Sequence, residues 1–244
     1  MGKLSKRLTA VCRLVSEGNA VLDVGCDHAY VPIELVSGGK APAAIASDIR
    51  SGPIAAAKKH ISEAALEEHI SACLCDGIPE DVKSQFENLH APEGKTLILA
   101  GMGGLLMRQI LDEAGDRVRL FSEIVASPQR DAESFRGFLI NHLCFQIIDE
   151  EMIKEDGKYY PVIKAVRCEG ENVLLLPDQA ELRYGPVLLK KQNPVLKEYL
   201  LKKEELHQKV LTGLQLSVNG SERTREVEEE IDIIRKALSR FGGV

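Results

Sequence analysis

The sequence contains no tryptophan, and aromatic residues make up only 5% of its 244 positions. A broad aromatic platform on which single-stranded bases would stack is therefore not expected. Uninterrupted apolar runs of the ~18 residues that a membrane-spanning helix needs are also missing. The basic stretch 1–14 lacks the apolar core and the small-residue cleavage site of a secretory signal. These absences lead us to expect a cytoplasmic protein.

Positive charge is scarce as well, because 31 lysines and arginines stand against 37 acidic residues and give a net charge of −6. At first sight this balance argues against binding of nucleic acid over the whole surface. The six cysteines are scattered and form no C-x-x-C pair. We therefore expect reduced, mostly buried thiols and no metal site.

With 44% hydrophobic and 28% charged residues, the composition is that of a soluble globular protein of one or two domains. Short apolar runs alternate with helical patterns in the first part of the chain. The runs indicate strands at 20–24, 43–47, 70–75, 96–100 and 123–126, and the patterns indicate helices at 53–66, 103–113 and 131–142. This alternation predicts βαβ units in a parallel, doubly wound α/β sheet.

Two further β-like runs, 145–153 and 159–166, follow with no helix between them. The turn that joins them contains Asp156-Gly157, a dipeptide strongly favoured in two-residue hairpin turns. The sheet is therefore predicted to have seven strands and to close on an antiparallel hairpin. NAD-binding sheets normally finish with parallel strands instead.

The last part of the chain has a helical pattern that begins after a linker punctuated by Pro177, Gly185-Pro186 and Asn193-Pro194. The change of pattern divides the chain into an α/β domain, 1–175, and a helical domain, 176–244.

Apolar residues recur with heptad-like spacing on two segments of the helical domain, which Asn219-Gly220 separates, with Ser221 as a candidate N-cap. The first stripe comprises Leu196, Tyr199, Lys203, Leu206, Val210 and Gly213, and Leu200, Leu211 and Leu214 widen it. The second comprises Val227, Ile231, Ile234, Leu238 and Phe241. The spacing predicts an antiparallel coiled-coil hairpin. A helix pair packed on the main domain is the alternative.

Acidic residues and glycines follow the predicted strands. Ligands of open α/β sheets bind outside the carboxyl ends of the strands, so these residues mark a candidate site. Asp48 stands 23 residues after Gly25, the separation at which an acid reaches the hydroxyls of a ribose. The full set of strand-end motifs is Asp23-Val24-Gly25, Asp48, Asp76-Gly77 and Gly101-Met102-Gly103-Gly104.

The first loop distinguishes between nucleotide ligands. At the three glycine positions of a dinucleotide fingerprint the sequence has Gly25, Asp27 and Tyr30. A carboxylate at Asp27 repels a pyrophosphate by several kcal/mol at a few Å in partly buried surroundings. A ligand with adenine and ribose, no phosphate and a positive charge fits better. S-adenosylmethionine matches that description.

These motifs together resemble class I S-adenosylmethionine-dependent methyltransferases, which have a Rossmann-like sheet. More narrowly, the sequence resembles the bacterial tRNA (adenine(22)-N1)-methyltransferases from residue 4 to about 200, and a helical tail is also a family feature. The segments that carry this resemblance are Leu4–Leu8, Gly25–Tyr30, Asp76-Gly77, Ala100–Gly104, Ser127–Gln129, Tyr184–Pro186 and Asn193-Pro194.

The resemblance implies a cofactor-binding set that consists of Arg7, Asp23, Gly25, Asp27, His28, Asp48, Ile49, Asp76, Gly77, Gly101, Met102 and Gly103. Asp23 and Gly25 would line the methionine end, and Asp48 would take the ribose hydroxyls. Asp76 and Gly77 would face the adenine. Gly101, Met102 and Gly103 would form the floor under the methyl group, unless the glycines only make a tight turn. Arg7 would close over the pocket or hold a phosphate.

The catalytic candidates are Asp27, His28 and Tyr30. Adenine N1 has an in-plane lone pair, so no proton must leave before attack, and a carboxylate would stabilise the charge that the product gains. Asp27 is the candidate for this role, with His28 or Tyr30 orienting the base. A helix cap is the equally weighted alternative for Asp27. Many enzymes that methylate amino groups of nucleobases carry Asn or Asp, then Pro-Pro and an aromatic residue, at the end of the fourth strand. This sequence has Gly101–Gly104 there, which disfavours methylation of an exocyclic amine.

Two basic strips are candidates for holding RNA. Residues 1–13 contain four basic residues and no acid, and residues 183–203 contain six against Glu198 alone. The basic residues are Lys3, Lys6, Arg7, Arg13, Arg183, Lys190, Lys191, Lys197, Lys202 and Lys203. We expect tRNA as partner and a monomer or weak dimer. The competing interpretations are a small-molecule or protein methyltransferase, a non-catalytic cofactor-binding module and, least favoured, an NAD oxidoreductase.

Overall fold

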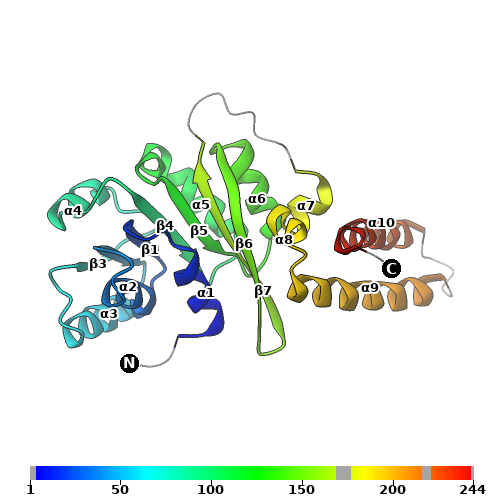
Figure 1. Cartoon of the computed structure of the whole chain (residues 1–244), viewed down its shortest axis with the longest axis horizontal. Helices are drawn as coiled ribbons and strands as arrows, with labels where there is room; N and C mark the ends of the chain where they lie inside the picture. Colours follow the sequence, from blue (N-terminus) through cyan, green and yellow to red (C-terminus); the bar gives the residue numbers. More distant parts are fainter. Residues whose placement is uncertain (1–3, 169–176, 216–220, 243–244) are drawn as a thin grey trace.

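The computed structural model describes residues 4–168, 177–215 and 221–242. Its α/β part is built on a seven-stranded sheet with the order β3-β2-β1-β4-β5-β7-β6 (Figure 1). Strands β1 to β5 run parallel, whereas β7 runs antiparallel to both β5 and β6. The predicted sheet with its closing hairpin is therefore confirmed. The strands are β1 (Ala20–Val24), β2 (Ala44–Asp48), β3 (Ile70–Leu74), β4 (Lys95–Ala100), β5 (Glu123–Ser127), β6 (Phe145–Glu155) and β7 (Lys158–Arg167).

Helices cover both faces of this sheet. One core cluster includes Ala10 and Ile33 from α1 and α2, and the other includes Phe86 and Phe135 from α4 and α6. Because both faces are covered, all residues of β1, β2 and β5 are buried. Helix α4 was not predicted, since seven residues are too few to show a helical period. The helices are α1 (Lys6–Leu14), α2 (Tyr30–Ser37), α3 (Ser51–Glu63), α4 (Val82–Asn88), α5 (Gly104–Ala114), the 3-10 helix Gly115–Leu120 and α6 (Ala132–Asn141).

The closing hairpin turns at Asp156 and Gly157, whose φ angles of 48° and 75° both lie in the left-handed region. A two-residue type I′ turn requires this at both positions, which explains the Asp-Gly pair. Helix α1 packs against β6 and β7, and its Arg13 forms an ion pair with Glu151 of β6. The hairpin thereby holds the N-terminal helix beside the sheet.

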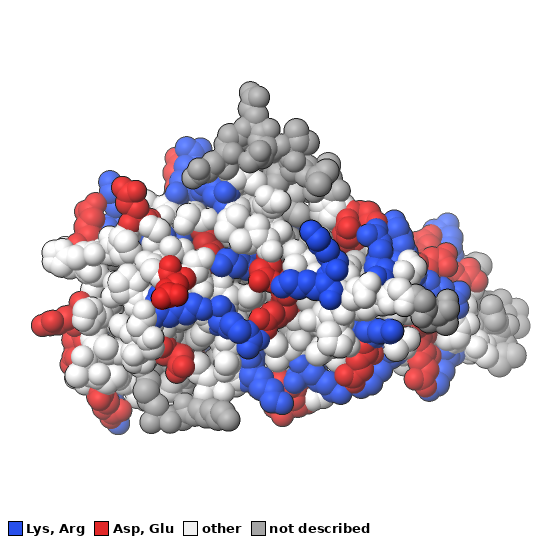
Figure 2. Space-filling model, viewed as in Figure 1, with Lys and Arg blue, Asp and Glu red and all other residues white. Residues whose placement is uncertain are grey.

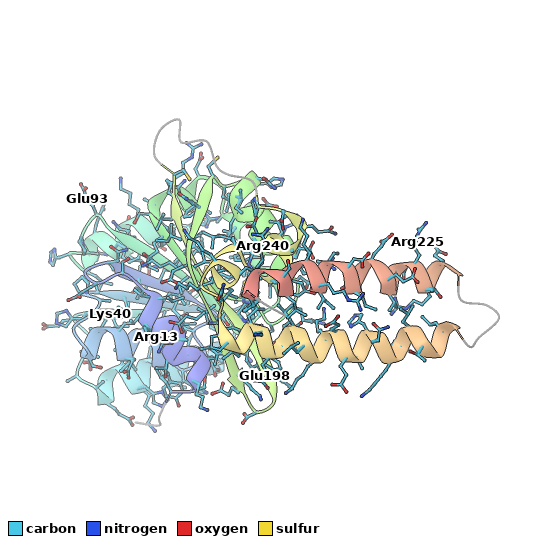
Figure 3. All side chains as sticks on the ribbon, turned by 45° about the vertical axis from the view of Figure 1, so that its right-hand side comes forward. Arg13, Lys40, Glu93, Glu198, Arg225 and Arg240 are labelled. Carbon is cyan, nitrogen blue, oxygen red and sulfur yellow. The ribbon has the colours of Figure 1, made fainter. Side chains whose placement is uncertain are left out.

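Residues 177–242 contain a helical tail. The expected linker is in fact two short helices, because Asp178 and Glu181 form a capping box and Pro186 begins the second helix. Figures 1 and 3 show α9 and α10 side by side and projecting from the sheet, with Glu198 near the inner end and Arg225 near the outer end. The tail helices are α7 (Gln179–Tyr184), α8 (Pro186–Lys190), α9 (Pro194–Gln215), α10 (Ser221–Leu238) and the 3-10 helix Ser239–Phe241.

The buried face of α9 differs from the predicted stripe. Leu206 and Val210 of that stripe are 59% and 40% exposed, whereas Leu200 and Leu211, expected only to widen it, are buried. The inner part of α9 shares a core cluster with Met152 of β6 as well as with α10, so two neighbours determine its buried face. The coiled-coil geometry stays a prediction.

A buried ion pair joins the tail to the sheet. Nε of Arg136 on α6 donates to Oε1 of Glu150 on β6 at 2.8 Å, and the two side chains are only 1% and 0% exposed. Arg136 also donates to the carbonyl oxygens of Leu182 and Arg183, and Glu150 accepts from the N–H of Val187. The first two tail helices are therefore held against the sheet by buried polar contacts.

Three elements of the sequence interpretation lie outside the described residues. They are Lys3, the domain boundary between residues 175 and 176, and the break at Asn219-Gly220. The division into two domains therefore stays a prediction. Within the described ranges, no helix is long and apolar enough to cross a membrane.

Candidate functional site

A cavity of about 400 Å³ opens at the carboxyl ends of β1 to β4. The topology brings these ends to one edge of the sheet, where ligands of open α/β folds bind. Seven of the cofactor-binding candidates line this cavity, namely Gly25, Asp48, Ile49, Asp76, Gly77, Gly101 and Met102. Residues at the ends of four different strands therefore line one cavity.

Three acids, Asp48, Asp76 and Glu113, line the cavity, and a fourth, Asp23, is buried in β1 directly before the lining residue Val24. Asp23 and Asp48 are each only 4% exposed. Burial, together with the nearby charge of Asp48, raises the pKa of Asp23 to about 7. Oδ1 of Asp48 accepts from the backbone N–H of Arg50 at 2.9 Å and from its Nε at 3.3 Å. Such a pair of acids stabilises a cationic ligand and disfavours a phosphate.

Glycines keep the cavity open. Gly25 has a φ of 73°, and a Cβ placed there would stand 3.0 Å from Cε of Met102. Any side chain at this position would therefore strain the backbone and push against the cavity floor. Gly101 also lines the cavity, with a φ of 86°. Gly101 therefore fits the predicted cavity floor. Gly104 fits the alternative of a tight turn, because a Cβ on Gly104 would meet the carbonyl oxygen of Asp131 at 2.5 Å.

Gly103 lies one residue beyond the lining set, at the N-cap of α5. Its backbone position is fixed by neighbouring bonds between the loops that follow β4 and β5. The N–H of Gln129 donates to the carbonyl oxygen of Met102 at 2.9 Å, and the N–H of Gly104 donates to that of Arg130 at 2.8 Å. These bonds hold the cavity floor against the end of β5.

The loop after β1 carries Asp27 and His28 at the edge of the site. Asp27 and Ala29 have left-handed φ angles of 50° and 59°, an arrangement that costs energy for residues other than glycine. Ala29 is the N-cap of α2, with no capping side chain in the part of the chain that the structure describes. The helix-cap interpretation of Asp27 is therefore wrong. Its side chain is 61% exposed and lies 3.6 Å from Nε2 of His28.

An aromatic cluster supports this loop. The rings of His28, Tyr30 and His60 lie with centroids 5.3 to 5.7 Å apart. Nδ1 of His60 lies 3.1 Å from the carbonyl oxygen of His28, within hydrogen-bond distance. His60 was not among the predicted site residues. It steadies the loop from α3.

Arg7 reaches the site from α1. Its guanidinium carbon lies 5.6 Å from the ring centroid of Tyr160. The guanidinium also approaches Gly101, because a Cβ placed on that glycine would stand 3.9 Å from both terminal nitrogens of Arg7. Ser127 ends β5 and pairs in register with Ala100, directly before Gly101. Arg7 and Ser127 thus meet at the same corner of the sheet.

Three buried polar atoms at this edge have no hydrogen-bond partner among residues 4–168, 177–215 and 221–242. They are Nη1 of Arg7, Nδ1 of His28 and Oγ of Ser127. Buried polar groups in proteins are nearly always paired, so three such atoms at one edge indicate a ligand that supplies partners. Ser127 was not among the predicted site residues. Its only signal was the Ser-Pro-Gln segment that follows β5.

Several lining residues were missed because they come from outside the strand ends. Arg50 lies two residues after Asp48, the acid that ends β2, and Cys75 lies between the end of β3 and Asp76. Leu106, Gln109 and Glu113 occupy one face of α5, at helical spacing. Helical periodicity could have found this last group, had the cavity-facing side of α5 been known.

Metal and thiol chemistry have no visible centre in the described ranges. No group of three or more His, Cys, Asp or Glu side chains that could hold a metal lies there. The six cysteines are free, and burial raises the pKa of Cys73 to about 11. Cys144 is exposed, contrary to the expectation of mostly buried thiols, and only Cys12 and Cys26 are fully buried.

Comparison with known proteins identifies the family. A sequence model of the tRNA (adenine(22)-N(1))-methyltransferase family matches residues 21–236. The enzyme of that name from Bacillus subtilis is 29% identical over 241 residues, 97% of each chain. A Streptococcus pneumoniae protein solved in complex with S-adenosyl-L-methionine is 30% identical with a TM-score of 0.80, over 97% of this chain and 100% of that one.

M. capricolum TrmK, solved with S-adenosyl-homocysteine, is 25% identical with a TM-score of 0.82, and the match covers 99% of this chain and 100% of that one. Both structural matches include the helical tail as well as the sheet. The chain therefore belongs to the tRNA (adenine(22)-N(1))-methyltransferase family.

Proposed function

We propose that this protein transfers a methyl group from S-adenosylmethionine to N1 of adenine 22 in tRNA. One observation carries the proposal. An acid-lined cavity of about 400 Å³ shares a sheet edge with three buried polar atoms that have no partner in the described part of the chain. The acid-lined cavity suits a cationic nucleoside, and the three polar atoms without partners suit a base placed beside it.

The residues of the cavity fit S-adenosylmethionine, which supplies an electrophilic methyl group on a sulfonium when bound. Asp48 has one carboxylate oxygen held by Arg50 and a second oxygen for the ribose hydroxyls. The buried carboxyl of Asp23 favours the positive charges at the methionine end. Ile49 is 61% exposed, so an adenine ring would remove this apolar side chain from water.

The target base is held by Arg7 and Ser127, which lie near the end of β4, and by His28 on the loop after β1. Oγ of Ser127 accepts a hydrogen bond from the exocyclic amine, and the guanidinium of Arg7 donates to a ring nitrogen other than N1. These contacts keep N1 free to attack, and alignment of this kind supplies roughly 7–11 kcal/mol in well-oriented reactions. Asp27 stabilises the positive charge that the base gains.

The tRNA is gripped at the junction of the α/β part and the tail. Figure 2 shows lysine and arginine side chains across the middle of one face and around the tail, interleaved with acidic ones. Arg13, Lys191 and Lys202 form ion pairs with acidic neighbours. For Lys190 and Lys197, the described residues offer no ion pair within 4.0 Å. These two lysines are therefore the strongest candidates for phosphate contacts.

We further propose that the protein acts in the cytoplasm, where its substrate is found, as a monomer or weak dimer. In the division proposed above, residues 1–175 bind the cofactor and residues 176–244 contribute to tRNA binding. Sedimentation at micromolar concentration tests the oligomeric state. A stable tetramer would contradict it.

A substrate competition tests the reaction class. The purified protein is incubated with labelled cofactor and unmodified bulk tRNA, free adenosine or total protein, and the methylated nucleoside is identified. We expect label in tRNA alone, as 1-methyladenosine. Label in adenosine or protein would instead support the competing small-molecule or protein methyltransferase, and no label in any substrate would support a cofactor-binding module.

A further inference from the structure

A second cavity lies where the tail meets the sheet, and it contains three of the chain's five tyrosines. Its volume is about 330 Å³, and its walls come from the loop after β5, the start of β7, and α7, α9 and α10. We call it the tyrosine cleft and define it by Tyr159, Tyr184, Tyr199, Lys203 and the loop 128–131. The elements that form it meet at the base of the tail (Figure 1).

We propose that the tyrosine cleft binds a second nucleobase of the tRNA, one that neighbours adenine 22 in the nucleotide chain. This inference rests on the proposed function, because it assigns a subsite for the same substrate. Enzymes that act on an extruded base often choose their substrate through contacts to the flanking nucleotides.

The aromatic lining suits a planar ring. The centroids of Tyr159 and Tyr199 lie 5.1 Å apart, and those of Tyr184 and Tyr199 lie 6.5 Å apart. The ammonium of Lys203 stands 5.7 Å from the ring centroid of Tyr184 and 5.8 Å from that of Tyr199. Aromatic side chains and cations over their faces are the groups on which splayed bases stack.

A buried hydroxyl provides the polar contact. Tyr184 is only 4% exposed, and its hydroxyl has no hydrogen-bond partner within the described ranges. Burial raises the pKa of Tyr184 above its ordinary value, so the hydroxyl stays protonated and can donate. The ring nitrogens and carbonyl oxygens of nucleobases are acceptors. An apolar ring would leave this hydroxyl unpaired.

The charges of the cleft favour a neutral base over a phosphate. Arg183 forms ion pairs with both Glu133 and Glu230, and Nζ of Lys203 lies 4.0 Å from Glu230. Arg136, which also lines the cleft, forms the buried ion pair with Glu150 of β6. The remaining lining cation, Arg130, is balanced in number by Asp131 of the same loop, so the cleft has little net charge to offer a phosphate. An uncharged nucleobase does not need such a charge in order to bind.

The cleft is joined to the methyl-transfer site through one loop. Gln129 and Arg130 line the cleft, while their backbone groups bond to Met102 and Gly104 on the other side. A base held in the cleft would therefore sit one loop away from the corner that takes the target adenine. Holding the neighbour in this way opposes restacking of the extruded adenine, whose exposure costs energy.

The test compares two variants with a matched control. Tyr184→Phe removes only the hydroxyl, and Tyr199→Ala removes a stacking face. Lys83→Ala, at an exposed position of α4 that lines neither cavity, is the control and should leave KM for tRNA unchanged. We expect KM for tRNA to rise about tenfold in Tyr199→Ala and several-fold in Tyr184→Phe, as loss of one base contact predicts. The Kd for S-adenosylmethionine and the thermal midpoint are measured to check each fold.

Combining a change in the tRNA with a change in the protein identifies what binds in the tyrosine cleft. Transcripts with an abasic site on either side of adenine 22 are tested with the wild type and with both variants. The abasic substrate should cost the wild type at least as much as Tyr199→Ala does, and neither variant should add to that loss. Fully additive losses, or no change in KM, would overturn the inference. Absence of methylation of intact tRNA by the wild type would instead contradict the proposed function itself.

If Tyr199→Ala does not fold, Tyr184→Phe alone decides, because the change removes one atom and keeps the packing. A phosphate-binding cleft would instead accept the abasic transcripts as well as the intact ones, since an abasic nucleotide keeps its phosphate. That outcome also overturns the proposal of a nucleobase.

Discussion

The buried carboxyl of Asp23 should destabilise the fold at neutral pH, and replacing it with asparagine should reveal how much. Its pKa of about 7 in the folded protein lies above the ordinary value of 3.8 for an aspartate. The unfolded chain therefore loses this proton at lower pH than the folded protein does. Stability associated with Asp23 is largest at low pH and falls as the pH rises from about 4 to about 7.

The magnitude follows from the shift. Each unit corresponds to about 1.4 kcal/mol, so the charged form costs the folded protein roughly 4 kcal/mol above pH 7, and about 3 kcal/mol of this cost appears between pH 5 and pH 8. Asp23→Asn removes the ionisation. The variant should therefore gain about 3 kcal/mol over the wild type between these two pH values.

Urea unfolding of both proteins at pH 5 and pH 8 measures this difference, with Asp76→Asn as the control at an exposed acid of the same cavity. The control retains Asp23, so it should show the same dependence on pH as the wild type. An equal difference between Asp23→Asn and wild type at both pH values would refute the reasoning. The same carboxylate should aid the cofactor, so S-adenosylmethionine should bind the wild type more tightly at pH 8 than at pH 6 and bind Asp23→Asn equally at both.

Four further predictions follow from the fold and the site. Arg136→Ala should cost about 3–5 kcal/mol in the free energy of unfolding, since it leaves a buried carboxylate without its partner; a loss below 1 kcal/mol would contradict this. Gly25→Ala should abolish cofactor binding, measured by calorimetry, while circular dichroism shows that the protein stays folded; a normal affinity would show that the cofactor binds elsewhere. Asp27→Asn should keep cofactor affinity and lose on the order of 10²-fold in kcat for tRNA; unchanged turnover would remove its catalytic role. Lys190→Ala and Lys197→Ala should each weaken tRNA binding and lower its salt slope by about one, whereas an unchanged slope would exclude phosphate contacts at these lysines.

Much of the fold could be predicted because its signals are local. The alternation of apolar runs with helical patterns produced five strands and three helices close to their observed bounds, and Asp156-Gly157 identified the hairpin. The cavity followed from topology, since parallel strands bring their carboxyl ends to one edge. Asp48 and Asp76 could thus be grouped although 28 residues separate them.

Other features depend on contacts between distant segments. Nothing local shows that Arg7 reaches Gly101, or that Ser127 joins the same corner, because α1 is positioned by the hairpin some 140 residues later. The buried face of α9 was misassigned for the same reason, since β6 shares it. The tyrosine cleft is likewise built by segments whose proximity only the tail packing creates.

The methylated nucleotide is the most direct test of the account. A tRNA transcript carrying adenine 22 and one carrying guanine there are incubated with the protein and S-adenosylmethionine, and the methylated position is mapped by reverse transcription. The account predicts 1-methyladenosine at nucleotide 22 of the first transcript and no methylation of the second. Methylation of both transcripts, or at another nucleotide, would contradict it.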